Sequence, residues 1–155
     1  MSSINQTLVN FKKIDENLAS FVYHCLKELR GSVRYSMDDF ITYLNENNYF
    51  RKGPYQILIG IKEDIKIGFM TCNRFAMPRY LGFGIEIEEI VIHPTSQGQG
   101  LGKEMIESFL SMCFRDKSLR IAIIKTDDSV NAGKLYSKYF DISNMVVYSK
   151  RLNKI

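Results

Sequence analysis

Three glycines alternate along a short stretch of the chain, at positions 98, 100 and 102, between an apolar run and an amphipathic one. Glycines at such a place let the backbone approach a ligand without interference from Cβ atoms. A helix that begins here leaves the N–H groups of its first turn unpaired and pointing outward. Those groups and the helix dipole suit a pyrophosphate. The stretch therefore predicts a loop that binds a phosphorylated ligand.

The spacing of the glycines distinguishes three kinds of phosphate loop. A P-loop needs a glycine five residues before Gly102, and Gln97 stands there. It also needs Ser or Thr after Lys103, and Glu104 stands there. A dinucleotide-binding fingerprint needs G-x-G-x-x-G, whereas these glycines follow G-x-G-x-G. The third kind, the Q/R-x-x-G-x-G/A loop, is satisfied at every position by Gln97, Gly100 and Gly102.

With this loop the sequence resembles the GNAT superfamily of acyl-CoA N-acyltransferases. In that family an apolar strand that ends in His-Pro commonly precedes the loop, as residues 90–94 do here. A later helix carries a small residue four positions before a tyrosine, as Ala132 and Tyr136 do. The resemblance runs from about residue 14 to the end of the chain. It implies direct transfer of an acetyl group from acetyl-CoA to a primary amine, without a metal.

The resemblance also implies which residues hold coenzyme A. The strand over 90–92 matches the one whose backbone pairs with the pantetheine arm, and a bulge in that strand opens a slot for the thioester. The N–H near Ile92 would polarise the acetyl carbonyl. Many family members have an asparagine at position 129 that contacts the cofactor arm, and either Ser129 or Asn131 would replace it. The implied cofactor-binding residues are Ile90, Val91, Ile92, Gln97, Gly98, Gln99, Gly100, Leu101, Gly102, Lys103, Ser129 and Asn131.

Acylation of an amine requires a base, because a protonated amine has no free electron pair. Glu88 is the candidate base, since it matches the position where several family members carry a glutamate that acts on the amine. Strand alternation predicts that Glu86 shares its face with Glu88 and that Glu89 lies on the other face. Glu86 could equally attract a cationic acceptor. Tyr136 is the candidate acid, because a phenol can donate a proton to the departing thiolate. The structural alternatives are a packed tyrosine and solvated carboxylates.

The sequence does not name the amine acceptor. Only residues 141–144 separate the tyrosine helix from the last predicted strand, where many family members have a hairpin that lines the acceptor site. The resemblance therefore implies a site that is open, or one that a second subunit completes in a homodimer. Aromatic side chains from 14–47 and 75–83 would suit a cationic amine, although packing in the core also explains them. They are Tyr35, Tyr43, Tyr49, Phe50, Phe75, Tyr80 and Phe83.

The elements around these residues predict a mixed α/β fold. Apolar periodicity indicates helices over 14–30, 37–47, 101–114 and 129–139, a hairpin over 55–74, and strands over 83–92, 120–125 and 145–152. Asp15 should cap the first helix, and Ser36 and Asp39 have the spacing of a capping box for the second. Residues 75–82 are predicted to form a loop. The crossover at 93–119 should make its flanking strands parallel.

We therefore expect one GNAT-like domain over residues 1–155, with a central mixed, mostly antiparallel sheet of about six strands flanked by about four helices. The 155 residues are 45% hydrophobic, and the net charge of +4 is too small and too scattered for nucleic acid. Neither the three cysteines nor the two histidines have the spacing of a disulfide framework or a metal site. No apolar run spans a membrane, and the first ten residues lack the features of a signal peptide, so we expect a cytoplasmic protein.

Two other functions compete with the N-acetyltransferase. One is an acyl-CoA-binding sensor that has lost catalysis, which the presence of Tyr136 and an acidic strand residue disfavours. The other is a nucleic-acid-binding module, which would need clustered basic residues and exposed aromatics on one strand face.

Overall fold

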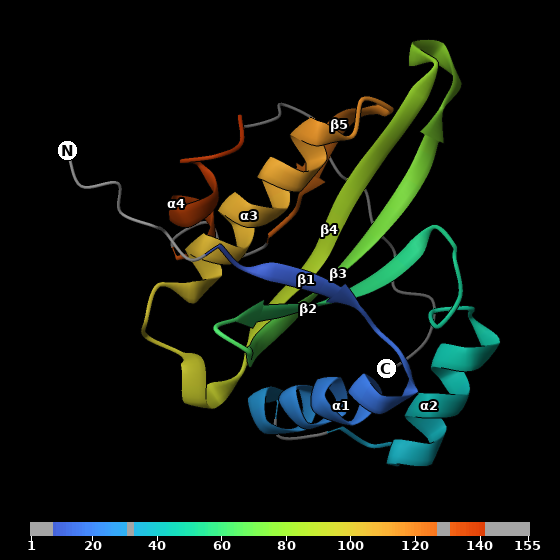
Figure 1. Cartoon of the computed structure of the whole chain (residues 1–155), viewed down its shortest axis with the longest axis vertical. Helices are drawn as coiled ribbons and strands as arrows, with labels where there is room; N and C mark the ends of the chain where they lie inside the picture. Colours follow the sequence, from blue (N-terminus) through green and yellow to red (C-terminus); the bar gives the residue numbers. More distant parts are fainter. Residues whose placement is uncertain (1–7, 31–32, 127–130, 142–155) are drawn as a thin grey trace. The chain divides into compact units, whose positions relative to one another are not determined.

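The structure is a computed structural model that describes residues 8–30, 33–126 and 131–141. Its contacts cluster into two units, one ending at Lys125 and the other beginning at Thr126. The first unit holds a β-sheet and three α-helices (Figure 1). The described part of the second unit holds one short helix. The mixed α/β fold predicted from the sequence is confirmed, while the single domain stays a prediction.

Five strands form one sheet in the described residues. They are β1 (Asn10–Lys13), β2 (Tyr55–Lys62), β3 (Ile65–Met77), β4 (Gly82–Ile92) and β5 (Leu119–Ile124). They lie side by side in sequence order. The pairs up to β4 are antiparallel, and β4 and β5 are parallel, as the predicted crossover requires. About six strands were expected, and the strand predicted over 145–152 lies outside the described residues.

Four α-helices accompany the sheet. They are α1 (Glu16–Arg30), α2 (Met37–Glu46), α3 (Leu101–Arg115) and α4 (Ala132–Tyr136). The two predicted caps are confirmed. The Leu18 N–H donates to the Asp15 carboxylate at 3.0 Å, and the Ser36 and Asp39 side chains form a reciprocal capping box.

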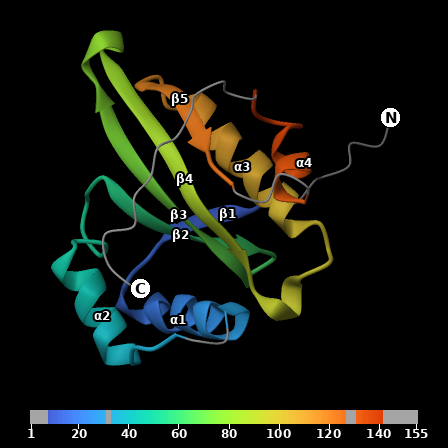
Figure 2. The same cartoon turned by 180° about the vertical axis from the view of Figure 1, so that it is seen from behind.

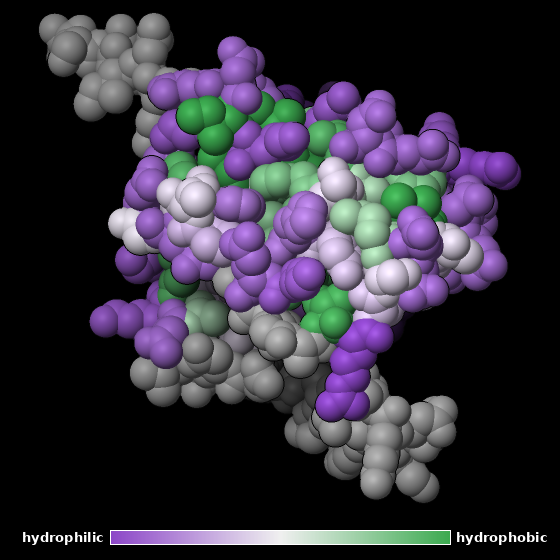
Figure 3. All heavy atoms as spheres, turned by 90° about the horizontal axis from the view of Figure 1, so that it is seen from below, coloured by the Kyte–Doolittle hydropathy of each residue, from purple (hydrophilic) through white to green (hydrophobic). Residues whose placement is uncertain are grey.

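The helices cover both faces of the sheet. α1 and α2 lie on one face and α3 lies on the other (Figures 1 and 2). Val22 of α1 and Leu44 of α2 are buried with Ile59 and Phe69 of the sheet. Figure 3 views the molecule from the side of α1 and α2. The described surface on that side is mostly hydrophilic, with small separate hydrophobic areas. The two opposed layers therefore bury the sheet and leave a polar exterior there.

The packing of α3 depends on a small residue in β2. Gly60 pairs with Phe11 of β1, so both lie on the face opposite Ile59. A Cβ atom at Gly60 would lie 3.2 Å from the Met105 side chain of α3. Phe11 also meets the Phe109 ring of α3 edge-on, with centroids 6.1 Å apart. The absence of a side chain at this position lets α3 lie close to the sheet.

The prediction of a loop over 75–82 is wrong. β3 continues through Met77, and β4 begins at Gly82 after the 3₁₀-helix η1 (Pro78–Tyr80). The two strands form a long hairpin that extends beyond β2 (Figure 1). Pro78 and Gly82 do mark a turn, but this turn is only the tip of the hairpin.

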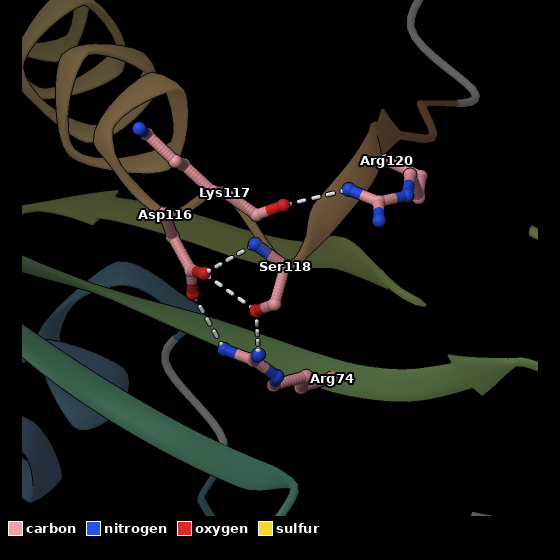
Figure 4. A network of polar contacts seen from close by, with 5 residues as sticks. All are labelled: Arg74, Asp116, Lys117, Ser118 and Arg120. Atoms are coloured by element: carbon pink, nitrogen blue, oxygen red, sulfur yellow. Dashed lines mark hydrogen bonds and ion pairs between the residues drawn. The ribbon is translucent and has the colours of Figure 1, made fainter. Parts of the chain in front are cut away.

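Long-range polar contacts stabilise the extended hairpin. Arg74 of β3 donates to the Asp116 carboxylate at 2.8 Å and to the Ser118 hydroxyl at 2.5 Å (Figure 4). Its guanidinium also lies 4.4 Å from the centre of the Phe83 ring. These contacts join β3 and β4 to the connection between α3 and β5, so residues far apart in the sequence decide how far the strands continue.

Arg120 of β5 holds the tip of the same hairpin. Its guanidinium donates to the carbonyls of Tyr80 and Leu81 at 3.1 and 3.3 Å. It also donates to the Lys117 carbonyl at 2.6 Å (Figure 4). One side chain therefore satisfies three carbonyl groups that the turns leave without strand partners.

Two further elements differ from their predictions. β1 was not predicted, because it has only four residues and its alternation is too short to recognise. The helix predicted over 129–139 is shorter in the described residues, where α4 begins at Ala132 and ends at Tyr136. After α4 the N–H groups of Tyr139 and Phe140 both donate to the Tyr136 carbonyl at 2.9 Å, so the chain continues as turns.

Candidate functional site

β4 carries a bulge at Glu88. Ile87 pairs with Cys72 of β3, and Glu89 pairs with the preceding residue Thr71. Glu88 is therefore the extra residue of the bulge, because it has no partner of its own between Cys72 and Thr71 of β3. The bulge that the family resemblance implied for this strand is present, two residues before Ile90.

The bulge changes which acidic residues share a face. Phe69 pairs with Val91 on the side of α1 and α2, and Thr71 and Asn73 follow on the same side of β3. Since Glu89 pairs with Thr71 and Glu86 pairs with Asn73, both glutamates lie on that side. The expectation that Glu89 lies opposite Glu86 is therefore wrong, because the extra residue breaks the simple alternation.

The pairing between β4 and β5 stops next to the bulge. It runs from Phe83 opposite Leu119 to Ile87 opposite Ile124. Residues 90–92, which were predicted to pair with the pantetheine arm, lie beyond this pairing but remain paired with β3. The β4 edge at 90–92 is therefore not covered by β5 in the described residues. An extended ligand can add to such an edge through backbone hydrogen bonds.

The glycine loop that follows β4 has a left-handed backbone at two positions. Gly98 and Gly100 have φ of +75° and +72°. A Cβ atom at either glycine would have no protein atom within 4 Å, so the space above them is open. The Gln97 side chain donates to the Ile92 carbonyl at 3.2 Å and ties the loop to the end of β4. The positive φ explains why glycine is needed at both positions.

The first turn of α3 begins at this loop. The Glu104 N–H donates to the Gly100 carbonyl at 3.3 Å, which makes Glu104 the first donor within the helix. The N–H groups of Leu101, Gly102 and Lys103 precede it and have no acceptor within the helix. A side chain at Gly102 would meet only Ile92, at 3.8 Å. The loop and the helix start therefore form a cradle that fits a pyrophosphate, with donors and no obstructing side chain.

The remaining predicted cofactor and acid residues belong to the second unit or lie outside the description. Ser129 lies outside the described residues. Asn131 precedes α4, and Tyr136 ends it. Tyr136 is half-buried, and burial raises the pKa of its phenol. The phenol is therefore protonated at neutral pH, as a proton donor must be.

The two candidate carboxylates have different surroundings. The Glu88 side chain is exposed at the bulge. The Glu86 side chain is only 23% exposed, and one of its oxygens lies 2.6 Å from the Lys125 ammonium. The structure thus gives Glu86 a cationic partner and leaves Glu88 at the surface of the bulge. The sequence does not single out Lys125, since no local pattern predicts which residue it meets on β4.

Tyrosines form a row at the end of α2 and the start of β2. The ring centroids of Tyr43 and Tyr49 are 6.1 Å apart, and those of Tyr49 and Tyr55 are 6.2 Å apart. Burial, with the neighbouring Tyr43 and then Glu88, raises the pKa of Tyr49 to about 12. Two of the predicted acceptor aromatics, Tyr43 and Tyr49, therefore lie together on the side of α1 and α2, and Tyr49 is close enough to Glu88 for that carboxylate to contribute to its raised pKa.

Phe83 was predicted to line the same region, and the structure places it elsewhere. It packs against the guanidinium of Arg74, which follows Asn73 on β3 and so lies on the opposite face. Phe75 instead lies on the side of α1 and α2, like Asn73 two residues before it. There it covers Gly84, where an added Cβ atom would lie 2.3 Å from the Phe75 ring. The predicted aromatic lining is thus divided between the two faces of the hairpin.

All three cysteines are free, and burial is the main cause that raises the pKa of Cys72 to about 12 and those of Cys25 and Cys113 to about 11. Within the described ranges, no three His, Cys, Asp or Glu side chains are grouped as metal ligands. No helix of the described part is long and apolar enough to cross a membrane.

Solved structures of several acetyltransferases share this fold. A ribosomal-protein-alanine N-acetyltransferase from Brucella melitensis biovar Abortus is 16% identical, with a TM-score of 0.74 over 94% of this chain and 99% of that chain. An aminoglycoside acetyltransferase from an uncultured soil metagenomic sample is 14% identical, with a TM-score of 0.71 over 96% and 99%. A GNAT family acetyltransferase from Staphylococcus aureus is 17% identical, with a TM-score of 0.67 over 94% and 99%.

These identities support the fold alone, because one fold serves many functions. No curated protein sequence matches the chain. The model of the acetyltransferase (GNAT) family, however, matches residues 18–141. That range includes the bulged strand, the glycine loop, α3 and α4. The chain therefore belongs to the GNAT acetyltransferase family.

Proposed function

We propose that the protein transfers an acetyl group from acetyl-CoA to a primary amine by direct attack. The observation that carries this proposal is the continuous path from the bulge at Glu88, along the β4 edge over 90–92, to the open glycine loop and the first turn of α3. The path offers a point where β4 and β5 cease to pair, an uncovered backbone edge and a phosphate cradle, in the order in which coenzyme A needs them. Acetyl-CoA supplies an activated thioester when it is bound.

The residues of the chain would divide the work as follows. The N–H groups at the start of α3 and the backbone of Gly98 and Gly100 would hold the pyrophosphate. The backbone of β4 over 90–92 would align the arm and stabilise the developing oxyanion. Glu88 would accept the proton of the amine, or Glu86 would do so from its position nearer to β5. Tyr136 would give a proton to the departing thiol.

The acceptor is proposed to be a cationic amine. Glu86 and Glu89 and the row of tyrosines beginning at Tyr43 provide carboxylates and π-faces on one side of the sheet, and the exposed Glu88 lies between the two glutamates at the bulge. The small net charge of +4 gives no reason to include nucleic acid or a membrane surface among the partners. A cytoplasmic enzyme, either with an open site or as a homodimer, completes the proposal.

A thiol-release assay tests the proposal. The full chain is mixed with acetyl-CoA and a panel of amines that includes polyamines, amino acids, aminoglycosides and lysine peptides. We expect thiol release with at least one amine, and loss of release in Gly100→Val, whose side chain is incompatible with the left-handed backbone. Gly53→Ala is the matched control, since an alanine there would meet only one atom, at 4.0 Å.

A catalytically silent acyl-CoA sensor is the second candidate. The observation that favours it is the ion pair between Glu86 and Lys125, because a cation of the protein itself already occupies this carboxylate. Binding of coenzyme A by the wild type, lost in Gly100→Val, together with no thiol release for any amine, would establish the sensor and reject the enzyme.

A further inference from the structure

An amine of the protein itself rests beside one of the acceptor-side carboxylates. The Lys125 Nζ atom lies 2.6 Å from Glu86 Oε1. The Lys125 side chain is 56% exposed, whereas the Glu86 side chain is 23% exposed. The ammonium group is thus accessible to solvent and to other cations, while the carboxylate on β4 is mostly covered.

Lys125 lies where the pairing between β4 and β5 ends. Ile123 pairs with Glu86 in parallel register, and Lys125 follows two residues later on the same face. Lys125 comes directly after Ile124, which forms the last pair between β5 and β4. Its amine therefore lies on the side of α1 and α2, at the point where the two strands cease to pair and the slot for the thioester would begin.

We propose that Lys125 is a self-acetylation site, modified by the protein's own active site when no external amine occupies it. This inference rests on the proposed function. The Lys125 ammonium gives one proton to Glu86 and then attacks the thioester carbonyl with its free electron pair. The C–N bond forms and the C–S bond breaks. The second nitrogen proton leaves with the thiol, and Glu86 returns its proton to water.

Tethering makes acetylation of Lys125 faster than acetylation of a dilute external amine. A group held next to a reaction site has an effective concentration of the order of millimolar or higher. Acetylation also removes the charge of Lys125 and ends its ion pair with Glu86. The modified protein would then present Glu86 to an external cationic amine, so the modification would prime the acceptor site.

The test uses the full chain with acetyl-CoA and no added amine, and mass mapping of acetylated lysines over time. Lys12 is the matched internal control, because it also forms an ion pair, with Asp15 at 3.5 Å, and its side chain is 59% exposed. We expect acetylation of Lys125 to be at least about tenfold faster than that of Lys12, with a rate independent of protein concentration. Gly100→Val and Glu86→Gln should each remove this excess.

The inference is overturned if Lys125 and Lys12 are acetylated at equal rates, or if the excess at Lys125 survives in Gly100→Val. Lys125→Arg separates this failure from failure of the proposed function. If Lys125→Arg releases thiol with an external amine and the wild type never carries an acetyl group at Lys125, the enzyme stands and self-acetylation is rejected. If neither protein releases thiol with any amine and no lysine is modified, both proposals fail.

Discussion

The two halves of β4 are held very differently. From Phe83 to Ile87 the strand lies between β3 and β5 and pairs with both. Over residues 90–92 it pairs with β3 and has left the pairing with β5. The bulge at Glu88 lies at the boundary between the closed half and the open half. One strand is therefore paired on both sides at one end and on one side only at the other, where we propose that coenzyme A binds.

The polar contacts follow the same division. Arg74 of β3 binds Asp116 and Ser118 just before β5 (Figure 4). Arg120 of β5 donates to the carbonyls of Tyr80 and Leu81 at the tip of the hairpin. The open half instead leads into two left-handed glycines with open space above them. Firm attachment of the closed half allows the open half to remain uncovered without loss of register.

The largest expected effect comes from adding a side chain where β3 lies very close to the open half of β4. In Gly68→Ala the new Cβ atom would lie 2.1 Å from the Val91 carbonyl oxygen, and backbone must move to relieve this clash. We expect a loss of about 3 kcal/mol or more in the free energy of unfolding. Urea denaturation measures it, and Gly53→Ala should stay within about 0.5 kcal/mol of wild type. A wild-type midpoint for Gly68→Ala would contradict the close approach of β3 and β4.

Tyr136→Phe tests whether the second unit takes part in chemistry. Removing a proton donor should lower kcat by about a hundredfold, because general acid catalysis contributes at least that much in many enzymes. The affinity for coenzyme A should change little, since the phenyl ring remains. Steady-state turnover and calorimetric binding measure the two effects. Unchanged turnover would remove Tyr136 from the mechanism.

Gly100→Val changes the glycine loop that follows the open half of β4 and leaves the closed half unaltered. A branched side chain at φ of +72° is strained, and it would enter the space above the loop. We expect at least about a tenfold loss of coenzyme A affinity by calorimetry. Arg74→Met, which acts on the closed half, should lower stability and leave this affinity near wild type. Equal losses of affinity in both variants would mean that the two halves are not independent.

The smallest effect concerns the closed half at low pH. Hydrogen bonds from Ser118, and then from Arg74, lower the pKa of Asp116 from 3.8 to about 2. A carboxyl whose pKa falls on folding stabilises the fold above its unfolded pKa, and this contribution disappears as pH falls from 3.8 to about 2. Asp116→Asn should therefore be less stable than wild type at neutral pH, and the difference should shrink through that window. Thermal unfolding across pH measures it, and a constant difference would contradict the network.

Local signals in the sequence predicted the glycine loop and two helix starts. The spacing of Gln97, Gly100 and Gly102 identified the loop, and Asp15 and Ser36 identified two helix starts, because each signal depends on neighbouring residues. The bulge was implied only by the family resemblance. Its effect on Glu86 and Glu89 was missed, because alternation counts every residue and a bulge adds one.

Contacts between distant residues decided what the sequence could not predict. β3 extends past Asn73 to Met77, and there Arg74 meets Asp116 and Ser118, more than forty positions away. The pair of Lys125 and Glu86 depends on the parallel register of β5, which no local pattern specifies. Such partners are set by tertiary packing, so residue types alone did not indicate them.

Backbone amide NMR during titration with coenzyme A tests the central claim most directly, since it reports on both halves of β4 in one experiment. We predict that shift changes concentrate over 90–92 in β4 and over 98–103 in the loop and the first turn of α3. The closed hairpin over 75–85 should change little. Changes that concentrate in the closed hairpin, or no changes at saturating coenzyme A, would contradict the assignment of the open half as the binding site.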